Sequence, residues 1–434
     1  MTKQQLAMEL SARRLDRYVD AISEGLGHAD RLTPFRAYFT GLLLPGERKS
    51  VEPMAARIAP TNVRRTHQSL HHFVSTSSWD DQAVLSRVGQ LAIPVLQSRE
   101  PIQAWIVDDT GIPKKGKHSV GVAHQYCGQL GKQANCQVAV SLSIANAFAS
   151  LPIAFRLYLS HEWIDDAQRR TACGVPAETA FATKQHISLE QIRRALAAGI
   201  PPGVVLADAA YGNDTAFRDE LTSLKVPYAV NIQETTTIWR PNEAPLAPPP
   251  RQGKRGKVPI RLQRTDAQRP ISAHAFAHEL SQSAFAEITW REGTKTPLRS
   301  RFAAVRIRPA HRDTLRSVPR DHEWLLIEWP VGEKTPTKYW LSTMDESTPL
   351  QTLVHTAKLR WRIERDYQEL KQELGLGQYE GRGWRGFHHH ATLCIAAYGF
   401  LLIEQGGFSP SGTRRLQLAQ PPLPTDFKPR GSTK

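Results

Sequence analysis

The stretch KLRWRIERDYQELKQELGL, residues 358–376, constrains the fold more than any other part of the sequence. It has no glycine or proline before Gly375 and consists mainly of straight-chain helix formers, so it predicts one uninterrupted helix. One side of this helix is apolar and carries Trp361, Tyr367, Leu370 and Leu374. Because an α-helix turns by about 100° per residue, Arg360, Glu364 and Lys371 lie within about 40° of one another on a second, charged side.

The charged side has two interpretations. Arginine and glutamate four residues apart commonly decorate a solvent-exposed helix, and the pattern by itself favours this interpretation. Alternatively, the flanking cations keep Glu364 ionised and provide two groups that can hold a phosphate beside it. Evidence from other parts of the sequence is needed to choose between these two interpretations.

Composition indicates a globular protein with a polyanionic partner. A length of 434 residues with 40% hydrophobic content is enough for two or three domains and a substantial core. The 56 Lys and Arg residues exceed the 41 Asp and Glu residues, which gives a net charge of +15. Nucleic acid fits this charge better than a membrane surface, because no long basic amphipathic helix is evident.

Other sequence features favour a cytoplasmic, nucleoid-associated protein. The N-terminal residues lack the apolar core of a secretory signal, and the longest apolar run, residues 391–403, is too short for a transmembrane helix of about 20 residues. No Walker-type or GxGxxG loop is present, so no nucleotide cofactor is expected. The four cysteines have no zinc or CxxC spacing and are expected to be reduced, small apolar residues: Cys127, Cys136, Cys173 and Cys394.

Helical periodicity predominates up to about Gln97, and basic residues recur there. They include Arg13, Arg14, Arg17, Arg57, Arg64, Arg65 and His67. This segment is expected to form a helical domain that binds DNA ends, although a solvated helix surface explains the charges equally simply. No convincing helix-turn-helix can be located from the sequence.

A β-rich region begins after Ile102. The runs AWIVDDTGIPKKGK, SVGVAHQY and NCQVAVSLSIAN predict an antiparallel three-stranded meander, with Asp108 and Asp109 at the end of its first strand. Two acidic residues at a strand end are often only turn formers. Alternation places Asp109 on the same face as Trp105 and Val107, and Asp108 on the opposite face.

A second acidic residue ends a buried strand further along the chain. The run VVLADAAYGND terminates in Asp208, and it lies between the predicted helix SLEQIRRALAAG and a helix that leads into the strand VPYAVNI. Strand, helix and strand of these lengths imply parallel pairing. Ligands of α/β sheets bind at the carboxyl ends of such strands, which favours a functional role for Asp208.

A long insertion follows, and then a basic, histidine-rich segment. The run RQGKRGKVPIRLQR, residues 251–264, contains no acidic residue, and several short β-type runs after it predict a β-rich subdomain. The segment GRGWRGFHHH, residues 381–390, has three consecutive histidines. Consecutive positions of a helix point in different directions, so we expect polar residues at a helix start or a DNA contact instead of one metal site.

Three blocks in this order resemble bacterial insertion-sequence transposases with an RNase H-like DDE core. They are DDTGIPKKGKHSVG (residues 108–121), VLADAAYG (205–212) and RWRIERDYQELK (360–371). The last block is similar to the family signature Tyr-x2-Arg-x3-Glu-x6-Lys, from which the chain departs at Ala357, in the tyrosine position. The resemblance covers about residues 35 to 405.

The resemblance implies an α/β fold in which an RNase H-like mixed sheet is flanked by helices. We expect an N-terminal helical domain (1–97), a first part of the catalytic core (98–232), a β-rich insertion (233–345), a second part of the core with the glutamate helix (346–405) and a basic disordered tail (406–434).

The resemblance also assigns the site. Since the family's first catalytic aspartate directly precedes a threonine, it selects Asp109, together with Asp208 and Glu364, as catalytic residues and as ligands of Mg²⁺ or Mn²⁺. Such hard cations prefer carboxylate oxygens. The residues expected along bound DNA are Arg360, Lys371, Lys114, Lys115, Lys117, Trp340, Arg255, Lys257, Arg382 and Arg385. Trp340 matches a tryptophan that stacks on a flipped base in some relatives, although a core position is the simpler role.

The implied function is cleavage of double-stranded DNA at terminal inverted repeats and transfer of the freed 3′-OH into target DNA, by a homodimer bound to paired ends. Two alternatives stay open: an RNase H-like nuclease without strand transfer, and a relative that binds DNA without cutting it. A carbohydrate hydrolase could also use paired carboxylates, but the basic charge and the cations around Glu364 fit it poorly.

Overall fold

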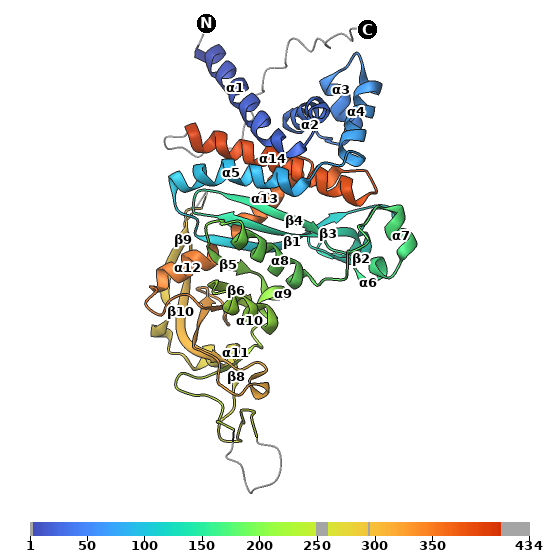
Figure 1. The fold of residues 1–434 in the computed structure, drawn as a ribbon. Helices are drawn as coiled ribbons and strands as arrows, with labels where there is room; N and C mark the ends of the chain where they lie inside the picture. The colour runs from blue at the N-terminus through green and yellow to red at the C-terminus, as the bar shows by residue number, and fades with distance from the viewer. Residues whose placement is uncertain (1–2, 249–258, 294–295, 409–434) are drawn as a thin grey trace.

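The computed structural model describes residues 3–248, 259–293 and 296–408. Helices gather at one end of an elongated molecule, a mixed sheet crosses its middle, and further strands form the other end (Figure 1). Within the described residues, no helix combines the length and apolar character needed to cross a bilayer.

The first layer consists of helices. The N-terminal helices are α1 (Lys3–Ser23), α2 (Leu32–Leu43), α3 (Val51–Ile58), α4 (Val63–Ser75) and α5 (Asp81–Arg99). The side chain of Asp80 caps α5 by accepting hydrogen bonds from the backbone N–H groups of Gln82 and Ala83, as is typical of a helix start. Helices α2, α3 and α4 pack on one another, and α5 lies along the C-terminal helix α14 (Trp384–Phe408).

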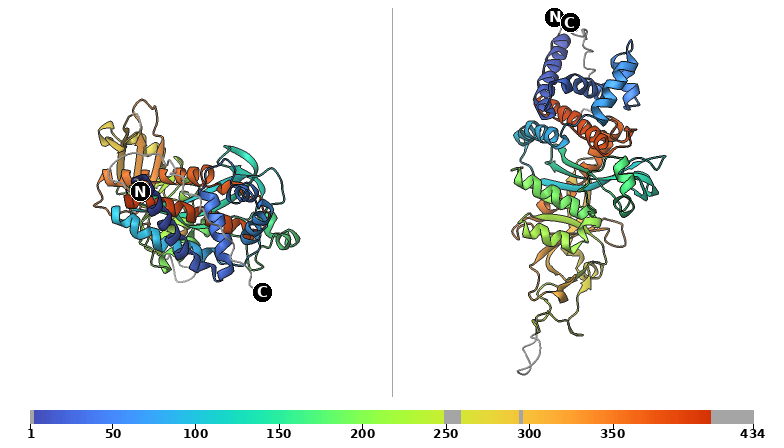
Figure 2. Two further views of the ribbon diagram at one scale, coloured as in Figure 1. Left: turned by 90° about the horizontal axis from the view of Figure 1, so that it is seen from above. Right: turned by 45° about the vertical axis from the view of Figure 1, so that its right-hand side comes forward.

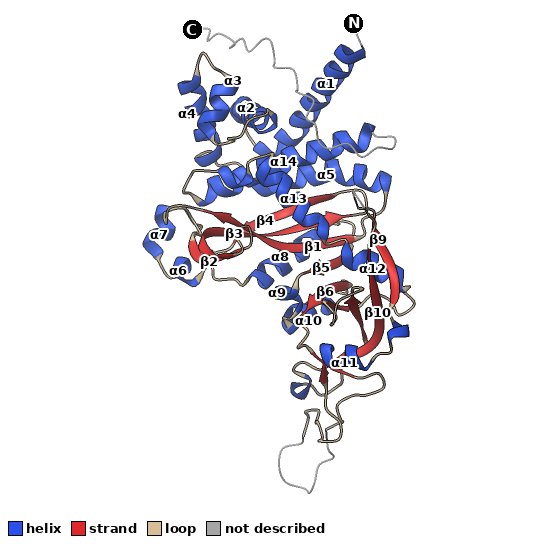
Figure 3. Ribbon diagram, turned by 180° about the vertical axis from the view of Figure 1, so that it is seen from behind, coloured by secondary structure: helices blue, strands red, loops and turns tan. Residues whose placement is uncertain are grey.

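The central sheet contains antiparallel and parallel pairs. Its strands are β1 (Ala104–Pro113), β2 (Ala123–Cys127), β3 (Lys132–Ala145), β4 (Ser150–Leu157), β5 (Val204–Ala207) and β6 (Tyr228–Ile232). β1 pairs antiparallel with β3 and parallel with β5, and β5 pairs parallel with β6. This mixed sheet with helices on both faces confirms the expected RNase H-like α/β class (Figure 3).

The predicted three-stranded meander is wrong in its strand order. β3, not β2, lies beside β1, with a continuous register from Ala104↔Ala145 to Pro113↔Cys136. The other edge of β3 pairs with β2 at its beginning and with β4 towards its end, because β3 is 14 residues long. β1 also continues to Pro113, so Asp108 and Asp109 lie inside a strand and not at its end.

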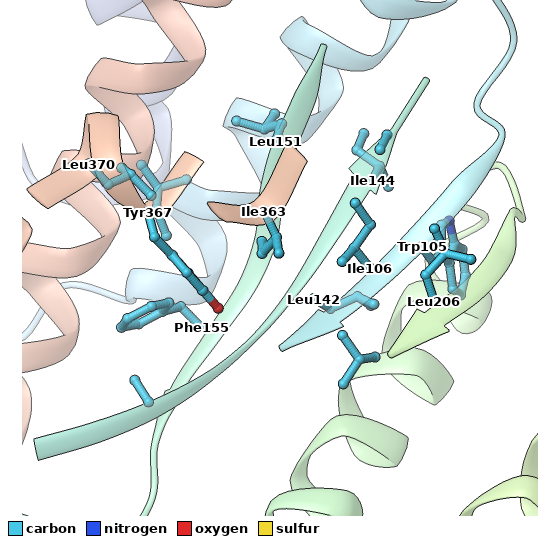
Figure 4. Close-up of a cluster of buried hydrophobic side chains, with 14 of the residues drawn as sticks. Trp105, Ile106, Leu142, Ile144, Leu151, Phe155, Leu206, Ile363, Tyr367 and Leu370 are labelled. Carbon is cyan, nitrogen blue, oxygen red and sulfur yellow. The ribbon is translucent and has the colours of Figure 1, made fainter. Parts of the chain in front are cut away.

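Helices cover the two faces of the sheet. The helices α5, α13 (Trp361–Gln372) and α14 lie on one face, and α8 (Lys184–Ala197), α9 (Ala209–Gly212) and α10 (Thr215–Ser223) lie on the other (Figures 1 and 2). Figure 4 shows Ile363 and Tyr367 of α13 directed at the strands. The hydroxyl groups of Tyr367 and Ser141 are 2.7 Å apart, which satisfies both in the buried interface. Two short helices, α6 (His161–Ile164) and α7 (Ala167–Ala172), lie beyond β4 in the chain.

The single helix predicted over residues 358–376 is wrong. The structure has two helices, α12 (Leu350–Lys358) and α13, with Leu359 and Arg360 in a tight turn between them. The backbone N–H of Arg362 donates to Leu359 O and that of Ile363 to Arg360 O, which is a 3₁₀ arrangement. The helices separate here because α12 packs on strands of the insertion while α13 packs on the central sheet.

The insertion extends the central sheet. Its elements are β7 (Thr237–Trp239), β8 (Ile271–Ser272), α11 (Ala273–Glu279), β9 (Ala286–Arg291), β10 (Leu298–Pro309), β11 (Glu323–Trp329) and β12 (Lys338–Ser342). β12 pairs antiparallel with β6, and the order continues through β11, β10, β7 and β8. Lys358, at the end of α12, forms a buried ion pair with Glu328 of β11 at 2.6 Å.

The three consecutive histidines lie near the start of α14, as the first of the two expectations stated, and their burial argues against the second, a DNA contact. Each has its own partners. His388 Nε2 lies 3.2 Å from Leu157 N, and His389 stacks on Trp79 with ring centroids 3.6 Å apart. His390 Nδ1 lies 2.8 Å from the Tyr38 hydroxyl. These side chains therefore join α14 to the N-terminal helices and to β4.

We predict that acidification destabilises this junction. Burial lowers the pKa of His390 to about 4, so this side chain stays neutral in the folded protein while an unfolded histidine binds a proton below about 6.5. The contribution of the neutral His390 to stability is therefore fully present above pH 6.5 and is lost as the pH falls towards 4, by about 2.5 kcal/mol at pH 4.5. His390→Gln should reduce the slope of thermal stability between pH 7 and 4.5, whereas the exposed His124→Gln should retain the full slope. An unchanged slope in His390→Gln would contradict the prediction.

Candidate active site

Two consecutive aspartates of β1 face opposite sides of the sheet. Asp108 Oδ2 lies 3.1 Å from Arg360 Nη2, on the side of α13. Asp109 Oδ2 accepts a hydrogen bond of 2.8 Å from Lys184 Nζ, and its Oδ1 accepts one of 3.2 Å from the Tyr211 hydroxyl, on the side of α8 and α9. The pleat of the strand thus gives the two carboxylates different partners.

Asp208 lies where β5 ends and α9 begins. One oxygen of its side chain, Oδ1, caps α9 by accepting hydrogen bonds from Ala210 N (2.9 Å) and Tyr211 N (3.4 Å). Its other oxygen, Oδ2, is 3.9 Å from Arg360 Nη2. The same guanidinium nitrogen therefore faces the carboxylates of Asp108 and Asp208.

The short helix α9 holds Asp208 in place because it lies directly against β6. A Cβ atom on Gly212 would come within 1.9 Å of Asn231 O, so only glycine permits this approach. The close contact fixes α9 and thereby the capped side chain of Asp208.

We predict that Gly212→Ala lowers the free energy of unfolding by about 2–3 kcal/mol, because the methyl group must push α9 away from β6. Chemical denaturation would measure this loss. The matched control, Ala210→Ser, alters an exposed position of the same helix and should change stability by less than about 0.5 kcal/mol. Equal stability of the two variants would show that α9 shifts without cost.

The third predicted catalytic residue, Glu364, lies in the first turn of α13 and is exposed. Its charge acts on the guanidinium of Arg360. Lys371, at the other end of α13, donates a 2.9 Å hydrogen bond to Gly111 O in β1. Burial lowers the pKa of Lys371, while the nearby carboxylate of Asp108 opposes this effect.

The electrostatics of the cluster centre on Asp108 and Arg360. Burial raises the pKa of Asp108 to about 7, the guanidinium of Arg360 opposes this, and Asp109 and Asp208 add to it. Burial alone would lower the pKa of Arg360, but Asp108, Asp208 and Glu364 together raise it. The guanidinium thus compensates carboxylates that repel one another.

The carboxylates of Asp108, Asp109, Asp208 and Glu364 are of the chemical type that a hard divalent cation prefers, but their geometry fits such an ion only in part. Within the described ranges, no three His, Cys, Asp or Glu side chains are grouped closely enough to hold a metal ion. Asp108 and Asp208, however, already share one positive charge, and Asp208 is 40% exposed at its side chain. These two carboxylates are therefore compatible in chemistry with a shared cation, and Glu364 is related to them only through its charge on Arg360.

The predicted DNA contacts occupy different environments. Lys115, Lys117, Arg382 and Arg385 are exposed, and Arg385 Nη1 donates to Thr76 O at 2.9 Å. Lys114 Nζ donates to Tyr379 O at 2.6 Å, and burial lowers the pKa of this lysine to about 8.

Of three further predicted DNA contacts, one is buried and two lie outside the described residues. Trp340 is only 2% exposed, and its ring centroid lies 5.5 Å from Lys358 Nζ. The ring therefore has no free face on which a base could stack. Arg255 and Lys257 lie outside the described residues.

The structure adds to this cluster three side chains that were not among the predicted site residues: Asp108, Lys184 and Tyr211. Asp108 is next to Asp109 in the sequence. The alternation of side chains places the two aspartates on opposite faces of the strand, but it does not show which face is directed towards the site. Tyr211 belongs to the block VLADAAYG, whereas Lys184 lies at the start of α8, about 75 residues from Asp109, and no local signal marks it.

The sequence matches the protein family described as "DDE superfamily endonuclease" over residues 21–297, which is more than half of the chain. The chain therefore belongs to this family of enzymes, and the resemblance to DDE enzymes is confirmed. Over 200 residues it is 30% identical to a protein of Microchaete diplosiphon described as "Probable transposase for insertion sequence element IS701". That alignment covers 46% of this chain and 48% of the relative, so the chain spans about half the length of the protein it matches. The family match includes Asp108, Asp109 and Asp208 and ends before Glu364.

Proposed function

We propose that the protein is a DDE transposase that cleaves DNA at the terminal inverted repeats of its insertion sequence and joins the freed 3′ ends to target DNA. The observation that carries the proposal is the meeting of Asp108 and Asp208, 100 residues apart in the sequence, around a single guanidinium nitrogen. Carboxylates at this position of an α/β sheet, in a chain of the DDE endonuclease family, suit phosphoryl transfer.

The metal-binding residues of the proposal are Asp208, Glu364 and one aspartate of β1. Bound Mg²⁺ or Mn²⁺ supplies charge stabilisation and activation of the attacking oxygen in an in-line displacement at phosphorus. The resemblance to the family selects Asp109 as this aspartate. The contacts favour Asp108, because it shares Arg360 with Asp208 whereas Asp109 is bound by Lys184 and Tyr211.

The protein residues have separable roles in this chemistry. Arg360 can hold a phosphate through its fork of N–H groups, and Lys371 adds positive charge on the same side. Tyr211 and Lys184 hold the Asp109 carboxylate in a fixed orientation. A nucleotide cofactor has no role in the scheme.

We predict that Asp208→Asn and Glu364→Gln each lower metal-dependent cleavage by about 100-fold or more, because each removes a charge from the reacting centre. The substrate is a plasmid that carries the genomic sequences flanking the coding region, and the products are nicked DNA and joined ends. Binding of the same DNA, measured by gel shift, should change little. Cleavage without joined ends would instead indicate a nuclease without strand transfer.

The same assay separates Asp108 from Asp109. Loss of cleavage in Asp108→Asn, with partial activity in Asp109→Asn, is the outcome that the contacts favour. The reverse result would restore the assignment made from the sequence.

The proposed DNA-end surface lies on α4. The helices α3 and α4 are joined by residues 59–62 and pack on α2, an arrangement of the helix-turn-helix type that the sequence did not reveal. Along α4, Arg64, Arg65 and Gln68 are exposed, and this helix carries no acidic residue. Such a helix suits contacts to phosphates and base edges. A dimer on paired ends remains part of the proposal.

We predict that the double variant Arg64→Ala and Arg65→Ala weakens binding of the end-containing DNA by about tenfold or more and lowers the salt dependence of binding, because two phosphate contacts are lost. Fluorescence anisotropy at several salt concentrations would measure both effects. Arg13→Ala is the matched control, since Arg13 is exposed on the N-terminal helix α1 but already paired with Glu9 at 2.7 Å. Equal losses in both variants would locate the binding surface elsewhere.

A further inference from the structure

The guanidinium of Arg360 occupies the space where a shared cation would be bound. Its Nη2 atom is 3.1 Å from Asp108 Oδ2 and 3.9 Å from Asp208 Oδ2. Asp108 lies in β1, and Asp208 directly follows the neighbouring strand β5, which pairs with β1 in parallel. A nitrogen that carries positive charge therefore bridges the two carboxylates that best fit a divalent cation.

The same side chain has an unused donor. Arg360 Nε is buried and has no hydrogen-bond partner among the residues that the structure describes. An unpaired buried N–H group is unfavourable, so the guanidinium is not fully satisfied where it lies. A phosphate could accept hydrogen bonds from Nε and an adjacent Nη atom at once, because the guanidinium fork matches two phosphate oxygens.

A guanidinium and a divalent cation cannot both occupy this position. Like charges repel strongly at such separations, and the repulsion is greater in a partly buried site than in water. Arg360 lies in the two-residue turn between α12 and α13, so its side chain can change direction without the loss of a hydrogen bond inside either helix.

We propose that Arg360 is an internal counter-ion that fills the cation position between Asp108 and Asp208 until a DNA phosphate draws its guanidinium away. Metal binding is then weak in the free protein and becomes strong on DNA. The metal site is thus completed by the substrate. The inference rests on the metal site of the proposed function.

The test is Mn²⁺ binding to the full-length protein without DNA, measured by electron paramagnetic resonance of free Mn²⁺. Arg360→Gln should bind Mn²⁺ at least about tenfold more tightly than the wild type, because the competing charge is gone. Lys184→Gln also removes one positive charge near the site, beside Asp109, and should have a smaller effect because Lys184 does not bridge Asp108 and Asp208. Arg365→Gln, on the same helix but paired with Glu369, should leave Mn²⁺ binding unchanged.

A second measurement uses the unaltered protein, so it does not depend on the folding of the Arg360 variant. A saturating DNA duplex from the genomic flank should lower the Kd of the wild type for Mn²⁺ by about tenfold. The background is the Mn²⁺ bound by the same duplex in the presence of the Asp208→Asn protein, and it is subtracted. By linkage, Mn²⁺ must tighten DNA binding by the same factor.

The outcomes separate this inference from the proposed function. If Asp208→Asn loses Mn²⁺ binding but neither Arg360→Gln nor DNA increases it, the metal site stands and the counter-ion role is refuted. An equal increase in Arg360→Gln and Lys184→Gln would also refute it, since general charge would then be the cause. If Mn²⁺ binding does not depend on Asp208 in any variant or with DNA, the metal site and the inference both fail.

Discussion

The pairing of β1 with an antiparallel neighbour on one side and a parallel neighbour on the other is the constraint on which the site depends. β3 holds β1 along its whole length, and β5 holds its first residues. The backbone of Asp108 and Asp109 is therefore fixed, and the pleat sends one carboxylate towards α13 and the other towards α8. Asp208 then lies beside Asp108 because β5 ends next to the middle of β1.

Much of the fold could be predicted from the sequence, because the strands and helices carry strong local patterns. The strand that ends in Asp208 and the strand after α10 both have apolar runs bounded by turn residues, and the parallel pairing follows from the helix between them. Strand order was less predictable. The position of β3 beside β1 depends on pairing between distant segments. The periodicity within a strand does not show which other strand it pairs with.

The break at Leu359 and Arg360 shows a second reason why prediction failed. Helix propensity is continuous through these residues, but the two halves pack on different parts of the molecule, and tertiary packing overrides propensity. The break places Arg360 at the start of α13, from which its side chain reaches Asp108 and Asp208. Similarly, the three histidines of α14 appear polar in the sequence, yet each has partners that only the folded chain supplies.

The junction of β6 with β12 makes the insertion and the central sheet one continuous hydrogen-bonded layer. The ion pair between Lys358 and Glu328 then clamps α12 to the insertion one residue before the turn that contains Arg360. Within the described residues, the strands of the insertion are therefore linked to the turn that contains Arg360 through paired strands and this ion pair. A change in the position of β11 would also move Lys358 and the turn beside it, so the insertion and Arg360 are structurally coupled although they belong to different parts of the sheet.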